Sequence, residues 1–312
     1  MKALAIDLGG SHATCAVVED QSILASQAVT TDGTTGLRPS LPMLAETLLA
    51  LMKRVGINAQ DCSGLAFSFC GLVDSRTTKI LSTNQKYDDA REFDLQGWAK
   101  SELGMRLRLE NDARMALLGE YYAGAARGYD DVVMTTLGTG IGGAAMIGGR
   151  LLRGKHAQAG CLGGHIPADF EGHACTCGAI GCTEAEASGW AIPLIAQEWP
   201  GFAQSRLARE ASVNFEALFR LAEERDPVAL AIRDRCLKVW AVGTVGLVHA
   251  YDPEIVVFGG GVMKSADTIL PFIQSYVEKH AWTPWGKVKV RAAELGNNAG
   301  LLGSIPLLSE PI

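Results

Sequence analysis

The chain has 312 residues, 48% of them apolar and 20% charged, and it carries a formal net charge of −6. This length and composition indicate a folded globular protein with room for two domains. The negative charge argues against a general attraction to nucleic acid or to anionic membranes, so we expect neither as a partner. No run approaches the roughly 18 apolar residues that a membrane span requires. A charge as early as Asp7 argues against a signal peptide, so we expect a cytoplasmic protein.

The N-terminal stretch predicts a β-hairpin and a third strand. The expected strands are 2–8, 13–18 and 22–29, and the turn Gly9-Gly10-Ser11 follows the first. A strand, a tight glycine turn and a second strand are typical of a hairpin, in which Asp7 would simply be solvated. The alternative is a functional turn, because glycine-rich turns expose backbone N–H groups that can hold phosphate. Asp7 could then help to place Mg²⁺, usually through water.

A strand-to-helix junction follows further along the chain. The segments before it predict helices at 37–55 and 93–103, strands at 65–69, 79–82 and 106–109, and a loop at 70–74. The junction itself reads Glu110-Asn111-Asp112-Ala113 and leads into a helix at 113–126. Asn111 and Asp112 could be helix caps. Alternatively, Asp112 is a carboxylate at the C-terminal end of a strand, where open α/β sheets bind ligands and where it could accept a proton from a hydroxyl.

The pattern of the N-terminus repeats about 130 residues later. A strand at 131–137, the turn Gly138-Thr139-Gly140 and a strand at 141–147 match the first hairpin. The repeat indicates two domains of related topology that face each other, with one glycine turn from each entering the cleft. Two such turns could clamp a polyphosphate. The alternative is a pair of unrelated hairpins.

A cysteine-rich segment at 160–186 follows and has little predicted regular structure. Cys175, Cys177 and Cys182 are spaced C-x-C-x4-C, and His165 lies ten residues before the first of them. Three thiolates and one imidazole form a closed tetrahedral zinc site. The alternative is a disulfide pair, but clustered cysteines in a reducing compartment favour a metal.

The remaining residues predict five helices, two strands and a third glycine run. The helices are expected at 187–198, 214–225, 227–251 and 266–279, the strands at 254–258 and 288–291, and a last helix at 298–308. Gly259-Gly260-Gly261 stands between a strand and a helix. This arrangement is typical of nucleotide sites, because glycines let a ribose or a base approach the backbone.

Together these motifs resemble the ROK family (repressors, open reading frames, sugar kinases) of the actin-like ATPase superfamily, over essentially the whole chain. The first two glycine turns resemble its two phosphate motifs, and residues 258–262 resemble its adenosine motif. Residues 110–113 resemble its catalytic motif. Gly164-His165 together with the cysteine segment up to Glu184 resembles its zinc and sugar signature, which is the most specific of the set.

The resemblance implies an α/β fold of two ribonuclease-H-like domains with a cleft between them. Residues 1–113 would form the N-terminal domain, completed by a C-terminal helix at about 298–312. Residues 114–297 would form the C-terminal domain and contain the zinc loop 160–186. The resemblance also implies a homodimer.

The implied activity is that of an ATP-dependent sugar kinase, which transfers a phosphoryl group to a hexose or hexose derivative, commonly at the 6-OH. Asp112 would be the general base, Mg²⁺ would accompany ATP, and Zn²⁺ would be structural. The sugar would be bound by Gly71, Asn111, Asp112, His165 and Glu184. ATP would be bound by Asp7, Gly9, Gly10, Ser11, Gly138, Thr139, Gly140, Gly259, Gly260 and Gly261. Zinc would be held by His165, Cys175, Cys177 and Cys182.

Three departures from the family pattern concern the sugar pocket. Leu162 stands where a sugar-binding Glu is usual, Cys70 replaces a Pro, and Glu186 replaces a Tyr. Glu186 and Glu171 are candidates to replace the missing carboxylate. The alternative function is a sugar-binding or sensor protein with weak or no kinase activity. Repressors of the family carry a DNA-binding domain before the first phosphate motif, and here that motif starts at Asp7, so we expect no such domain.

Overall fold

The computed structural model describes residues 1–83 and 85–310. The chain divides into two compact units, each with its own hydrophobic core. The first unit comprises Met1–Gly128, Arg153–Ala159 and the C-terminal stretch from Glu294. The second comprises Tyr129–Leu152 and Gly160–Ala293. Among the described residues, no helix has both the length and the apolar character that crossing a membrane demands.

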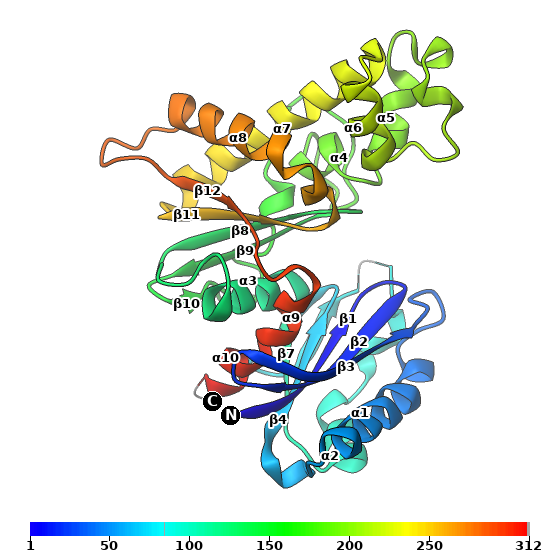
Figure 1. Ribbon diagram of the computed structural model, residues 1–312, viewed down its shortest axis with the longest axis vertical. Coiled ribbons are helices and arrows are strands. Elements are labelled where there is room, and N and C mark those ends of the chain that lie inside the picture. The colour runs from blue at the N-terminus through cyan, green and yellow to red at the C-terminus, as the bar shows by residue number, and fades with distance from the viewer. Residues whose placement is uncertain (84, 311–312) are drawn as a thin grey trace. The chain divides into compact units, whose positions relative to one another are not determined.

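A five-stranded sheet with the order β3-β2-β1-β4-β7 forms the centre of the first unit (Figure 1). Its first three strands are antiparallel, whereas β1, β4 and β7 run parallel. The strands are β1 (Lys2–Leu8), β2 (His12–Glu19), β3 (Ser22–Thr30), β4 (Cys62–Phe69) and β7 (Leu107–Asn111). All five were expected from the sequence, and each expected range overlaps its strand.

Helices cover both faces of this sheet because alternate residues of β1 are buried on opposite sides. Leu4 and Ile6 belong to the core under α1 (Leu41–Val55) and α2 (Leu95–Leu103). The remaining helices are α3 (Asp112–Ala123), α9 (Ala299–Leu302) and α10 (Ser304–Ser309).

The helix expected at 37–55 begins later than predicted, at Leu41, because Arg38–Ser40 forms a 3-10 turn around Pro39. The segment expected to be a loop at 70–74 contains a short strand. Here β5 (Leu72–Asp74) pairs with β6 (Lys79–Ser82).

The second unit repeats the strand order of the first. Its sheet runs β10-β9-β8-β11-β12, with β8, β9 and β10 antiparallel and β8, β11 and β12 parallel. The strands are β8 (Val132–Leu137), β9 (Ile141–Ile147), β10 (Arg150–Leu151), β11 (Ile255–Gly259) and β12 (Lys289–Ala292). The two glycine turns therefore occupy equivalent places in two sheets of related topology, as the repeat predicts.

Most of the core of the second unit is built by its helices. They are α4 (Thr183–Ala187), α5 (Ile192–Glu198), α6 (Phe215–Glu223), α7 (Pro227–Tyr251) and α8 (Ala266–His280). The start of α7 was expected from its sequence, since Asp226 caps the N–H groups of Val228 and Ala229. The single helix expected at 187–198 is wrong in its first part, because α4 ends before Ser188, which has an extended backbone.

The end of the chain also differs from expectation. The predicted helix at 298–308 consists of α9 and α10, which meet at Gly303.

The expected domain boundary at residue 113 differs from the boundary between the two units, because the first unit continues through α3 to Gly128. This helix packs so closely on α9 that a Cβ atom at Gly119 would lie 2.0 Å from the carbonyl oxygen of Ala299. The last two residues of the expected range 298–312 lie outside the described residues.

Candidate functional site

Asp7 lies at the end of β1, and it is not a simple solvated residue of a hairpin. Its Oδ1 accepts a hydrogen bond of 2.7 Å from the hydroxyl of Ser68 on β4. Burial raises the pKa of Asp7, and the bond from Ser68 and the charge of His12 oppose that rise. A Cβ atom on Gly300 would lie 3.1 Å from this carboxyl group, so the start of α9 approaches it closely. The carboxylate is thus fixed beside the first glycine turn.

A buried tyrosine, Tyr87, supports this first glycine turn through hydrogen bonds. The hydroxyl of Tyr87 donates to the carbonyl oxygen of Gly9 over 2.7 Å and also lies 2.8 Å from Oγ1 of Thr31. Gly33 donates its N–H to the carbonyl oxygen of Gly10 and accepts one from Tyr87. No local sequence signal marks this support, because Tyr87 is 78 residues away from Gly9 along the chain.

The β7–α3 junction combines both functions that the sequence left open. Asn111 is the cap of α3, since its Oδ1 accepts from the N–H of Arg114. Its amide nitrogen donates to the carbonyl oxygen of Gly71 at 3.0 Å and to Oδ1 of Asp112 at 2.8 Å. The N–H of Ala113 donates to the same Oδ1 at 2.8 Å. Among the described residues, the hydrogen bonds to Asp112 all fall on Oδ1, which leaves Oδ2 for a ligand.

The electrostatic surroundings of Asp112 suit a base. Loss of hydration and then the carboxylate of Asp7 raise the pKa of Asp112 to about 6, against opposing hydrogen bonds from Ala113 and Asn111 and the charge of Lys86. The side chain is nevertheless accessible to solvent. A carboxylate with a pKa near the working pH can accept a proton and remain largely ionised at neutrality.

A buried ion-pair network supports the junction from behind. Glu110 is fully buried, and its Oε2 accepts from Arg153 at 2.7 Å and from the hydroxyl of Ser75 at 2.8 Å. Its Oε1 lies 3.4 Å from Arg114, which is also fully buried, and accepts from the N–H of Asn111 at 3.0 Å. These hydrogen bonds and ion pairs tie Glu110 to the backbone that carries Asn111. Arg114 lies only four residues after Glu110 along the chain, whereas Arg153 lies 43 residues away and no local sequence signal connects it to Glu110.

The second glycine turn is tied to the end of the cysteine segment. The N–H of Gly138 donates to the carbonyl oxygen of Gly140 at 3.0 Å. Oε2 of Glu184 accepts from the N–H of Ile141 at 2.7 Å, and a Cβ atom on Gly140 would lie 2.7 Å from that oxygen. Oε1 of Glu184 accepts from the indole of Trp190 at 3.3 Å. The expected sugar-binding carboxylate therefore lies against the turn and is mostly buried.

The third glycine run lies next to the second turn within the same unit. Gly260 has φ +91°, and a Cβ atom there would lie 2.2 Å from the carbonyl oxygen of Leu137, which directly precedes Gly138. Gly259 ends β11, and Gly261 begins the 3-10 turn before α8. The requirement for glycine is therefore strongest at the central position of the run.

Four residues of the cysteine segment form a cluster that could hold a metal ion. One ligand atom each from His165, Cys175, Cys177 and Cys182 lies within 4.8 Å of every other. The Sγ atoms of Cys177 and Cys182 are 3.6 Å apart, and Sγ of Cys175 is 3.5 Å from Nδ1 of His165. A disulfide requires about 2.05 Å between sulfurs, so the alternative of a bonded pair is wrong. Ligands at about 2.3 Å from a tetrahedral zinc ion would have edges of this size.

The cluster is formed by a tightly folded loop. Short antiparallel bridges join Pro167 to Cys182 and Ala174 to Ile180. Gly181 has φ +66°, and a Cβ atom there would lie 1.4 Å from the carbonyl oxygen of Asp169. Only glycine fits this position, as expected for a backbone that wraps around an ion.

The structure argues against Glu186 as a replacement for the missing sugar-binding carboxylate. Its side chain is fully buried and paired with the guanidinium group of Arg235 and with Nδ1 of His173, the latter at 2.9 Å. These partners hold the pKa of Glu186 below its usual value although burial opposes the shift. Leu162 is 38% exposed, and Glu171 is also exposed.

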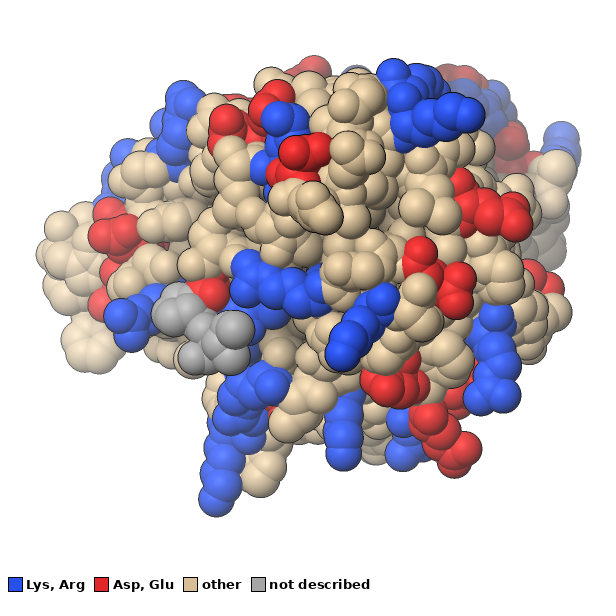
Figure 2. Space-filling view, turned by 90° about the horizontal axis from the view of Figure 1, so that it is seen from below, with Lys and Arg blue, Asp and Glu red and all other residues tan. Residues whose placement is uncertain are grey.

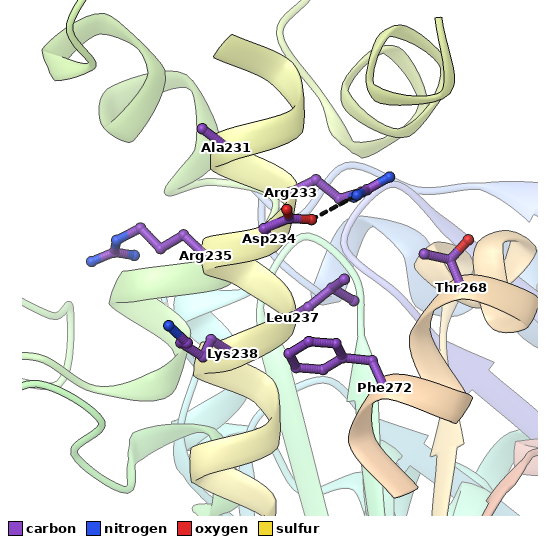
Figure 3. A pocket seen from close by; sticks show the side chains of 8 residues that line it. All are labelled: Ala231, Arg233, Asp234, Arg235, Leu237, Lys238, Thr268 and Phe272. Atoms are coloured by element: carbon purple, nitrogen blue, oxygen red, sulfur yellow. Dashed lines mark hydrogen bonds and ion pairs between the residues drawn. The ribbon is translucent and has the colours of Figure 1, made fainter. Parts of the chain in front are cut away.

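A hollow lies between α7 and α8 in the second unit (Figure 3). Figure 3 shows Arg235 and Lys238 extending from α7 on the side away from Thr268 and Phe272, with Arg233 paired to Asp234. None of the expected site residues lines this hollow.

Figure 2 shows one face of the molecule, on which Lys and Arg side chains are interspersed with Asp and Glu side chains.

Known proteins resemble this chain over almost its full length. The ROK family model matches residues 3–310. The glucokinase of Thermotoga maritima is 31% identical over 319 residues, which cover 100% of this chain and 98% of that protein. A ROK hexokinase from Thermus thermophilus has a TM-score of 0.81 at 31% identity, covering 98% of this chain and 97% of the other. A ROK family glucokinase from Streptomyces griseus, solved in complex with glucose and AMPPNP, has a TM-score of 0.80 at 29% identity, covering 98% and 99%. These similarities confirm the expected α/β fold of the actin-like ATPase type.

Proposed function

Since the chain belongs to the ROK family, we propose that it is an ATP-dependent sugar kinase of the hexokinase and glucokinase type. It transfers the γ-phosphoryl group of ATP to a hexose or hexose derivative, at the 6-OH. The observation that carries this proposal is the geometry of Asp112, whose Oδ1 is fixed by two donors. Its Oδ2 is then free to accept a proton, and its pKa is raised to about 6.

In the proposed reaction Asp112 is the general base. Its Oδ2 takes the proton of the sugar hydroxyl as the hydroxyl oxygen attacks the γ-phosphorus atom, and ADP leaves with the electrons of the broken bond. Phosphoryl transfer depends mainly on positioning and charge stabilisation. The hydrogen bonds by which Asn111 and Glu110 position Asp112 therefore matter more than the intrinsic reactivity of its carboxylate.

The glycine turns are proposed to hold ATP. Their exposed backbone N–H groups suit phosphate oxygens, and glycine lets the nucleotide approach the backbone. Mg²⁺ bound with ATP would neutralise phosphate charge, and Asp7 fits a role near it, since the Ser68 bond occupies only one of its two oxygens. The residues proposed for this role are Asp7, Gly9, Gly10, Ser11, Gly138, Thr139, Gly140, Gly259, Gly260 and Gly261.

We propose that the cluster of His165, Cys175, Cys177 and Cys182 holds a structural Zn²⁺. The donor set of three thiols and one imidazole fits zinc, and so do the distances between its atoms. Nδ1 of His165 faces the sulfurs, which leaves Nε2 as a donor for a sugar hydroxyl.

Gly71, Asn111, Asp112, His165 and Glu184 are proposed to bind the sugar. Because Leu162 stands where the family usually has a sugar-binding Glu, the proposed pocket has one hydrogen-bond acceptor fewer. We therefore propose the substrate as a class, hexoses and hexose derivatives, and name no single sugar. Because such a kinase uses cytoplasmic ATP, we propose that the protein acts in the cytoplasm. We also propose that it is a homodimer. Size-exclusion chromatography with light scattering tests the oligomeric state.

The test is turnover with a panel of hexoses and N-acetylhexosamines. Purified protein receives ATP, Mg²⁺ and one sugar at a time, and ADP release is followed against a control without sugar. Phosphorylation of at least one sugar is expected, and no turnover on any of them would refute the kinase proposal. Sugar binding by calorimetry without turnover would instead support a sensor with weak or no activity, an alternative that the apolar Leu162 favours.

A further inference from the structure

We propose that Lys86 contacts the transferred phosphoryl group, its ammonium group lying over the first glycine turn as a cation for the γ-phosphate oxygens. This inference rests on the proposed kinase function and adds a residue that none of the sequence motifs contains. All the residues that support it belong to the first unit.

The position of the Lys86 side chain is the first observation. A Cβ atom on Gly10 would lie 3.0 Å from Nζ of Lys86 and 3.1 Å from its Cδ and Cε atoms. A Cβ atom on Gly33 would lie 3.1 Å from Cβ of Lys86. The lysine therefore runs along the turn that is proposed to hold phosphate, and the absence of side chains at Gly10 and Gly33 makes room for it.

The backbone next to Lys86 is anchored through Tyr87. Gln85 and Tyr87, on either side of it, have φ values of +63° and +59°, which are strained for residues other than glycine. Tyr87 is completely buried and bonded to the carbonyl oxygen of Gly9, and its N–H donates to Gly33. The contacts of Tyr87 thus place the backbone of Lys86 beside the turn, in a locally strained conformation.

The charges nearby explain why a cation is needed. Asp7 and Asp112 are both carboxylates of this unit, and each repels an incoming polyphosphate. Among the charged groups that act on Asp112, Lys86 supplies the positive charge. Its ammonium group forms no hydrogen bond or ion pair with another residue in the ranges 1–83 and 85–310, so it is available to a ligand.

The proposed role of Lys86 is consistent with the bonds that form and break in the reaction. The bond between the γ-phosphorus atom and the bridging oxygen of ADP breaks, a bond from the sugar oxygen to phosphorus forms, and the hydroxyl proton moves to Asp112. Lys86 gives up no proton in this step. Its charge stabilises the peripheral oxygens of the transferring group, where the negative charge is concentrated.

The experiment compares Lys86→Met with Lys86→Arg and with Lys79→Met, a control at an exposed lysine of β6. Because one preorganised charge contact is worth roughly 10²-fold in rate, we expect Lys86→Met to lose about that factor in kcat/KM for ATP. The KM for sugar should change little. Lys86→Arg should recover at least about tenfold of the loss, and Lys79→Met should behave as the wild type.

Unchanged kcat/KM in Lys86→Met would overturn the inference, and so would a loss that Lys86→Arg does not reverse. Thermal unfolding of each variant separates a chemical effect from damage to the fold. Calorimetric titration with pyrophosphate and Mg²⁺ provides a second readout, in which Lys86→Met should bind more weakly. If the wild type turned over no sugar, the kinase proposal would fail, whereas this titration would still test Lys86.

Discussion

The side-chain amide of Asn111 donates a hydrogen bond of 2.8 Å to Oδ1 of Asp112, the residue that follows it in the chain. The same amide nitrogen donates to the carbonyl oxygen of Gly71, so the strand end, the helix start and the 70–74 segment are joined at one point. A carboxylate held in this way presents one defined oxygen to a substrate, which is what a general base requires.

Replacement of Asp112 by Asn should reduce turnover by about 10²-fold or more and leave sugar binding intact, because the amide keeps the shape but cannot accept the proton. Steady-state kinetics and sugar calorimetry measure the two effects. Asp234→Asn, at an exposed aspartate of α7, is the control and should retain full activity. Unchanged turnover in Asp112→Asn would remove Asp112 as the base.

The pH profile of kcat/KM should have an acidic limb near pH 6. Only the ionised form of Asp112 accepts a proton, so activity is present above its pKa and is lost as the pH falls through about 6. The charged groups that act on this carboxyl are Asp7, which raises its pKa, and Lys86, which lowers it. A limb at the ordinary aspartate pKa of about 4 would contradict the assignment.

Metal analysis of the purified protein should find one zinc ion per chain. Cys177→Ser should lose the metal and weaken sugar binding, because His165 is held in place by the same ion in the proposed site. Cys62→Ser is the matched control, since this half-buried thiol lies outside the cluster. Zinc retained at full stoichiometry in Cys177→Ser would refute the proposed ligand set.

Removal of the charge of Glu186 should destabilise the second unit. Glu186→Gln leaves the guanidinium group of Arg235 without its carboxylate, and breaking such a buried pair costs about 3 kcal/mol. The measurement is unfolding by denaturant, followed by circular dichroism. Glu198→Gln removes the other carboxylate partner of His173, but Glu198 is 69% exposed, so its loss should cost far less. Equal stability of the two variants would argue against a buried ion pair.

The parts of the fold and site that depend on neighbouring residues were predictable from the sequence. Asp226 and Pro227 predict the start of α7, because the cap and the first turn are local. The C-x-C-x4-C spacing predicts the cluster, because a short loop brings its ligands together. The repeat of strand, glycine turn and strand predicts two domains of related topology, and the two five-stranded sheets have equivalent strand orders.

The contacts between distant residues were not predictable. Arg153 pairs with Glu110 across 43 residues, and Arg235 pairs with Glu186 across 49. No periodicity or turn signal links such positions. From the sequence alone Glu186 is therefore a candidate for the sugar pocket, whereas its buried partners argue against that role. The position of Lys86 over Gly10 depends on Tyr87 in the same way, since a single lysine in a loop has no distinguishing pattern.

The hydrogen bond from Ile141 to Glu184 has a consequence for how a loss of metal would be detected. Glu184 follows the proposed zinc ligand Cys182 by two residues, and it also accepts a hydrogen bond from the first residue of β9, directly after Gly140. If the proposed zinc ion holds this loop, its removal should therefore also release the turn proposed to hold the nucleotide. Chelator-treated protein should thus show weakened affinity for ATP as well as for the sugar, and a screen that measured only sugar affinity would miss the effect on the nucleotide.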